Sequence, residues 1–179
     1  MEFKPVTSKD FRIIYNDMTE QFPPEELKSY TRFCELLESG RYYVKSVIDE
    51  AQIVGYVIFI IVNDSLWLDY IAVFKQFHSK GYGGRILKAL LEEFKKGIYL
   101  EVEKPDKLLP NTLRRIKFYT NLGAQKLNYD YYYPSAAAPL AMDLYYLPYK
   151  SLPEQVAADI KDVFAFLHSD IAYLNSGIQ

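Results

Sequence analysis

The sequence predicts an α+β fold, in which a mixed, mostly antiparallel sheet of about seven strands is flanked by helices. Two apolar runs rich in β-branched and aromatic residues, 53–62 and 66–73, are separated only by turn residues, which is typical of antiparallel strands. The second run leads through a basic, glycine-bearing turn into a segment with apolar residues at helical spacing. A further strand pattern, 98–103, follows. Strand, helix and strand in this order indicate a right-handed crossover between neighbouring parallel strands.

The remaining elements follow from the same patterns of spacing, caps and breakers. In chain order we expect a strand at 3–6, a helix from a cap at Ser8 or Asp10 to Met18, a helix at 25–37, a strand at 42–48, a helix at about 84–95, a helix at 110–122, and strands at 125–133 and 142–149. No linker divides the chain, so residues 1–179 are expected to form a single domain with a C-terminal helix at about 153–174.

Composition narrows the class of function. Half of the 179 residues are hydrophobic, which is enough for a substantial core, and the net charge of −2 disfavours a nucleic-acid partner. The single cysteine, Cys34, allows no internal disulfide and no cysteine metal cluster, so we expect no metal and a cytoplasmic location. We expect no membrane partner, because no signal peptide is recognisable and the longest apolar run, 53–62, is too short to span a bilayer.

The glycine-bearing turn is the strongest candidate binding site. Gly81, Gly83 and Gly84 lack side chains, so the turn can present its backbone N–H groups to a ligand at close range. The N-terminus of the following helix adds unpaired donors and a partial positive charge. This combination predicts a phosphorylated ligand.

Two segments carry a family resemblance. Residues 73–83, VFKQFHSKGYG, resemble the V-x-P-x-Y-R-G-K-G-x-G signature of the GNAT superfamily of N-acetyltransferases, and residues 115–124, RIKFYTNLGA, resemble its "lYeklGF" segment. Their order and spacing are those of the family. Lys75, His78, Ser79 and Ala124 depart from the motifs, where the family has Pro, Arg, Gly and Phe. Since backbone N–H groups hold most of a pyrophosphate, we expect the loss of the arginine to weaken binding without abolishing it.

The resemblance implies a GNAT-like acyl-CoA N-acyltransferase fold and the direct transfer of an acetyl group from acetyl-CoA to a primary amine of a small molecule, peptide or lysine. It implies that backbone groups of Ile71, Ala72 and Val73 bind pantetheine. It places the pyrophosphate on the turn residues Lys80, Gly81, Tyr82, Gly83, Gly84 and Arg85, with His78 and Ser79 also among the cofactor-binding residues. Tyr119 matches the family tyrosine that protonates the departing thiolate, which a phenol can do without first ionising.

An alkyl ammonium must lose a proton before it can attack, so a carboxylate is needed as base. The candidates are Asp69, Glu101 and Glu103, of which the last two share one face of their strand. Solvation, or ion pairing with Lys104 or Arg114, is an equally good explanation for each of these carboxylates.

Three questions stay open at this stage. The fold could serve a non-catalytic acyl-CoA-binding or protein-interaction domain. The broad apolar stripe of the last helix could dock on its own domain, form a homodimer or close over the acceptor site. The acceptor amine itself is not identified.

Overall fold

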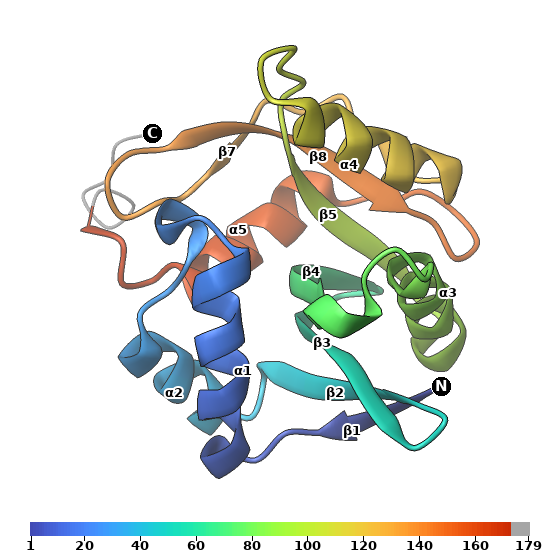
Figure 1. Cartoon of the computed structure of the whole chain (residues 1–179). Helices are drawn as coiled ribbons and strands as arrows, with labels where there is room; N and C mark the ends of the chain where they lie inside the picture. Colours follow the sequence, from blue (N-terminus) through green and yellow to red (C-terminus); the bar gives the residue numbers. More distant parts are fainter. Residues whose placement is uncertain (173–179) are drawn as a thin grey trace. The chain divides into compact units, whose positions relative to one another are not determined.

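The computed structural model describes residues 1–172, which form an eight-stranded, mostly antiparallel sheet and five α-helices (Figure 1). The strands are β1 (Glu2–Pro5), β2 (Tyr43–Asp49), β3 (Gln52–Val62), β4 (Ser65–Val73), β5 (Gly97–Glu103), β6 (Gln125–Lys126), β7 (Tyr131–Tyr133) and β8 (Leu140–Leu147). The helices are α1 (Ser8–Gln21), α2 (Tyr30–Glu38), α3 (Tyr82–Phe94), α4 (Pro110–Asn121) and α5 (Val156–Leu167), with 3₁₀ turns η1 (Pro24–Glu26) and η2 (Lys75–Phe77). The predicted α+β class is confirmed, with one strand more than expected.

The chain divides into two compact units. The first holds Met1–Ile60 and Leu68–Phe94, and the second holds Ile61–Trp67 and the chain from Lys95 onward. Strands β3 and β4 therefore contribute residues to both units. The prediction of a single domain stays a prediction.

Strands of the first unit are hydrogen-bonded in the order β1-β2-β3-β4. Phe11 of α1 and Phe33 of α2 are fully buried against each other, with ring centroids 5.2 Å apart. The cap of α1 is Thr7, whose side chain accepts a hydrogen bond from the Asp10 amide, so the prediction of Ser8 or Asp10 as the cap is wrong. Thr7 has the extended backbone that an N-cap requires, whereas Ser8 is already helical.

The predicted helix at 25–37 is interrupted. The chain makes η1, is extended at Leu27 and Ser29, and only then enters α2. Ser29 caps α2 by accepting a hydrogen bond from the Arg32 amide at 3.2 Å. The side chain of Lys28 bonds to Asp69 of β4, which holds the intervening segment in its non-helical course.

Gly55 of β3 allows β4 to approach closely. A Cβ at this position would lie 2.1 Å from the carbonyl oxygen of Ala72 and 3.0 Å from the Cα of Val73. These two residues belong to the strand end that leads into the glycine-bearing turn. Only glycine fits here without displacing that backbone.

Strand β8 is central to the second unit, because β5, β6 and β7 all pair with it antiparallel. The predicted strand at 125–133 is therefore two short strands. Between them the Leu127 amide bonds to the Leu144 carbonyl, and the Tyr129 amide turns back to Leu127. This tight turn at the polar residues 128–130 takes the chain out of the ladder.

Helix α5 buries part of its apolar stripe. Ile160, Val163 and Leu167 are buried. The helix ends at Leu167, earlier than predicted, and the His168 amide caps it by bonding to the Phe164 carbonyl. The predicted final residues, 173 and 174, lie outside the described part of the chain.

Candidate active site

The glycine-bearing turn connects β4 to α3 in the first unit. Ser79 and Gly81 have φ angles of 61° and 76°, in the left-handed region, and α3 begins at Tyr82. A Cβ on Gly81 would meet no atom within 4 Å, so glycine is favoured there by its conformation and not by lack of space. Gly83 and Gly84 lie in the first turn of α3, where backbone N–H groups point out of the helix. The turn thus has the geometry of an anion site.

Side chains of the turn have partners of their own in the first unit. The Arg85 guanidinium donates to the Asp49 carboxylate at 2.9 Å and lies over the Tyr82 ring, and the bond to Asp49 raises the pKa of Arg85. Lys80 lies over the Phe77 ring. Since the side chain of Arg85 is 52% exposed, its ion pair with Asp49 contributes little to stability.

The end of β4 is held by two side chains. The Val73 carbonyl lies 2.7 Å from Nε2 of His78 and accepts a longer bond from Gln21. His78, which replaces the family arginine, is thus placed beside the strand end. That the backbone of 71–73 binds pantetheine stays a prediction.

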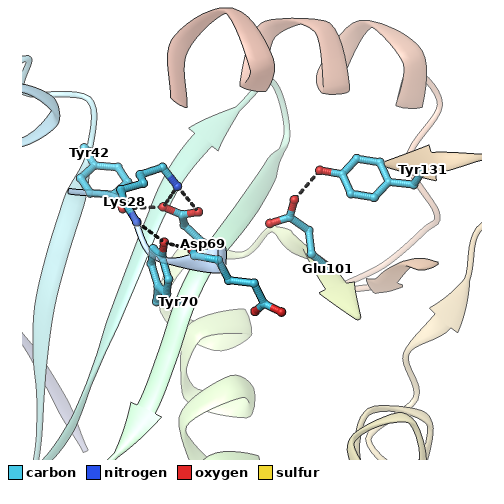
Figure 2. Close-up of polar contacts among 7 residues, drawn as sticks. Lys28, Tyr42, Asp69, Tyr70, Glu101 and Tyr131 are labelled. Carbon is cyan, nitrogen blue, oxygen red and sulfur yellow. Dashed lines mark hydrogen bonds and ion pairs between the residues drawn. The ribbon is translucent and has the colours of Figure 1, made fainter. Parts of the chain in front are cut away.

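Asp69 lies in a buried polar cluster of the first unit. Its carboxylate oxygens accept two bonds from Nζ of Lys28, at 2.8 and 2.9 Å, and one from the Tyr42 hydroxyl (Figure 2). The neighbouring Tyr70 hydroxyl donates to the Glu26 carbonyl at 2.6 Å. The Asp69 carboxylate is therefore held by a charged partner, Lys28, and by an uncharged one, Tyr42.

Glu101 and Glu103 share one face of β5, as predicted, while Leu100 and Val102 between them are buried. Their partners differ. The Tyr131 hydroxyl donates to Oε1 of Glu101, as Figure 2 shows. Glu103 instead pairs with Arg115 of α4 at 2.5 Å, not with the expected Lys104 or Arg114.

Tyr119 of α4 is 8% exposed. Burial raises the pKa of its phenol, with smaller opposing effects of Arg115, which lowers the pKa, and Glu103, which raises it. Within residues 1–172 the Tyr119 hydroxyl has no hydrogen-bond partner, and its raised pKa keeps it protonated.

Several residues of these clusters were missed from the sequence: Lys28, Tyr42, Arg115 and Tyr131. Each lies on a different element from its partner. Among the described residues, no group of three or more His, Cys, Asp or Glu side chains is placed to hold a metal ion. No helix in the described range has the length and apolar character needed to cross a membrane.

Comparisons with known proteins agree with the fold. The chain is 29% identical over 161 residues to YjbC of Bacillus subtilis (strain 168), which carries an acetyltransferase name; the match covers 87% of this chain and 81% of YjbC. A Bacteroides thetaiotaomicron structure, named as a GNAT-family acetyltransferase, has a TM-score of 0.83 at 24% identity and covers 93% of this chain and 98% of its own. An aminoglycoside 6′-N-acetyltransferase complexed with coenzyme A has a TM-score of 0.59 at 16% identity, over 86% and 100% of the two chains.

Residues 10–124, well over half of the chain, match the model of the acetyltransferase (GNAT) family. The glycine-bearing turn and both motif segments fall within this range or at its end. The chain belongs to the GNAT family of acetyltransferases.

Proposed function

We propose that the protein transfers the acetyl group of acetyl-CoA to a primary amine of a small molecule, peptide or lysine side chain. The observation that carries the proposal is the turn at 78–85, which bears the family motif and has an anion site's geometry at the start of α3. An amine acceptor is supported by the aminoglycoside N-acetyltransferase of the same fold.

The turn would hold the pyrophosphate of the co-substrate. Backbone N–H groups at Gly83 and Gly84 supply the principal donors, and Lys80 and Arg85 add positive charge. Arg85 would leave Asp49 for the phosphate, because its present ion pair is half-exposed.

Glu101 of β5 would accept the amine proton, directly or through a water molecule. Ion pairs hold the carboxylates of Asp69 and Glu103, and a paired cation makes a carboxylate a weaker base. The Tyr131 hydroxyl donates to Oε1 of Glu101 and orients this carboxylate.

Tyr119 would complete the reaction. As the amine nitrogen bonds to the acetyl carbon, the carbon–sulfur bond breaks and the sulfur needs a proton. The Tyr119 phenol can give it, because its raised pKa keeps it protonated and its hydroxyl has no partner among residues 1–172.

One observation favours a second candidate, a non-catalytic acyl-CoA-binding domain. His78 stands where the family has an arginine and is placed against the Val73 carbonyl instead of being held outward. In this case the fold would bind acetyl-CoA without transferring the acetyl group.

Thermal unfolding with and without acetyl-CoA tests the binding half of the proposal. A ligand at 100 times its dissociation constant adds about 2.7 kcal/mol to the free energy of unfolding. We expect acetyl-CoA to raise the unfolding temperature clearly for the wild type and for Lys88→Leu, which changes an exposed residue of α3. For Gly83→Leu we expect a smaller rise. No shift for the wild type at millimolar acetyl-CoA would contradict both candidates.

A further inference from the structure

We infer that Tyr131 is a positioning residue for Glu101, and that helix α5 sets the position of Tyr131. The inference rests on the proposed function only in the role given to Glu101. The contacts that carry it all lie within the second unit.

The Tyr131 hydroxyl has a fixed place beside the Glu101 carboxylate. Tyr131 is 2% exposed, and its backbone pairs with Met142 of β8. Glu101 pairs with Leu144 of the same strand, so β8 determines the spacing of the two backbones. A phenol has only two side-chain torsions, which makes it a stiff support for a carboxylate.

Aromatic rings of β4 and α5 pack on the Tyr131 ring. The centroid of Trp67 lies 5.9 Å from it, and that of Phe164 of α5 also lies 5.9 Å from it. Trp67 is fully buried and packs in turn on Tyr99 of β5, with centroids 5.0 Å apart. One of these rings therefore comes from β4 and the other from α5.

Helix α5 is itself fixed near its start by Asp159. Asp159 is 3% exposed. Its carboxylate accepts hydrogen bonds from Nδ2 of Asn63 at 2.6 Å and from the Tyr99 hydroxyl at 2.5 Å. Phe164 follows five residues later on the same helix. The position of the Phe164 ring, and through it that of Tyr131, thus depends on how α5 is docked.

Loss of the Tyr131 hydroxyl has a defined chemical consequence. A donor to a carboxylate favours its ionised form, so the Glu101 carboxyl should bind a proton more readily in Tyr131→Phe. The phenylalanine keeps the ring contacts with Trp67 and Phe164, so the fold is retained. The charged pair of Glu103 and Arg115 on the same face of β5 is unchanged in the variant.

The test is a carbon-13 NMR titration of the glutamate side-chain carboxyls, with the Glu101 signal assigned by its absence in Glu101→Gln. We expect Tyr131→Phe to raise the Glu101 midpoint by about one pH unit, the effect of one hydrogen bond to a charged group. Tyr132→Phe is the matched control, since this neighbouring tyrosine of β7 is 53% exposed, and it should leave the midpoint unchanged. An unchanged midpoint in Tyr131→Phe would overturn the positioning role.

The role of α5 is tested in the same titration with Phe164→Ala. We expect a smaller rise of the Glu101 midpoint in the wild-type background and no further rise in the Tyr131→Phe background. The inference that α5 acts through Tyr131 would be overturned if Phe164→Ala left the Glu101 midpoint unchanged in the wild-type background. It would also be overturned if Phe164→Ala raised the midpoint further in the Tyr131→Phe background. The titration needs neither acetyl-CoA nor an amine, so a failure of the proposed function would appear separately, as absent turnover.

Discussion

Lys28 donates to both carboxylate oxygens of Asp69, and the two side chains are only 7% and 1% exposed. The pair joins the segment between η1 and α2 to β4 within the first unit (Figure 2). Nearby, the Tyr70 hydroxyl bonds to the Glu26 carbonyl, so one strand holds two points of this segment. The contact explains why residues 27–29 are not helical where the sequence favours a helix.

Breaking this pair from one side should be costly. Lys28→Met would leave the Asp69 charge buried without its cation, and we expect a loss of about 3 to 5 kcal/mol in the free energy of unfolding. Urea unfolding measures this. Lys45→Met is the control, because its pair with Glu93 is longer and more exposed, and it should cost less than about 1 kcal/mol.

Removal of both charges should be tolerated better than removal of one. In Lys28→Met/Asp69→Leu no buried charge is left, so part of the lost stability should return. Equal losses in Lys28→Met and Lys45→Met would show that the Lys28 ion pair is not buried as described.

Gly55→Ala should destabilise the first unit through a steric clash. The added methyl group would lie 2.1 Å from the Ala72 carbonyl oxygen, a backbone atom that cannot rotate away. We expect a cost of about 3 kcal/mol or more in urea unfolding. Gly40→Ala is the control for backbone conformation without a clash, since Gly40 has a φ of 72° and open space around it. This change should lower the free energy of unfolding by only about 1 kcal/mol. A cost for Gly55→Ala no greater than for Gly40→Ala would contradict the close approach.

Stability should fall in alkaline solution because of buried tyrosines. Burial, and then a hydrogen bond to Asp159, raise the pKa of Tyr99 above the ordinary value of 10.0. Below pH 10 Tyr99 is protonated in both the folded and the unfolded chain. Above pH 10 the unfolded chain loses this proton first, so the free energy of unfolding decreases as the pH rises. Tyr99→Phe should flatten this decline in urea unfolding between pH 8 and 11, and the exposed Tyr132→Phe should not. Identical pH slopes for Tyr99→Phe and the wild type would refute the assignment.

Tyr119→Phe should reduce turnover without harming the fold. If Tyr119 protonates the sulfur, kcat should fall about 100-fold while the KM for acetyl-CoA stays the same. The free energy of unfolding should not decrease, because the deleted hydroxyl has no partner within residues 1–172. Steady-state kinetics and urea unfolding check the two parts, and an unchanged kcat would exclude Tyr119 as the acid.

The elements with strong local patterns were predicted well. The β-branched run of β3, the aromatic run of β4 and the helical spacing of α3 gave boundaries within about two residues, because local pattern and tertiary burial agree there. The break before α2 and the turn between β6 and β7 were missed. Both depend on partners distant in sequence, Asp69 in one case and Leu144 in the other.

The same distinction applies to the site. The glycine-bearing turn is contiguous, so its motif was visible in the sequence. The supports of the carboxylates were not, because Lys28 lies 41 residues from Asp69 and Tyr131 lies 30 residues from Glu101. Arg114 and Arg115 are adjacent and equally basic, and only the rotation of α4 directs Arg115 to Glu103.

The most direct test of the account is acetyl transfer itself. The wild-type protein is incubated with acetyl-CoA and a panel of primary amines that includes an aminoglycoside, a free polyamine and a lysine-containing peptide. We expect mass spectrometry to show that one class of amine gains an acetyl group, with one free CoA thiol released per amide, and we expect Glu101→Gln to lose most of this activity. Clear binding of acetyl-CoA without acetylation of any amine would contradict the transferase and favour the non-catalytic binding domain.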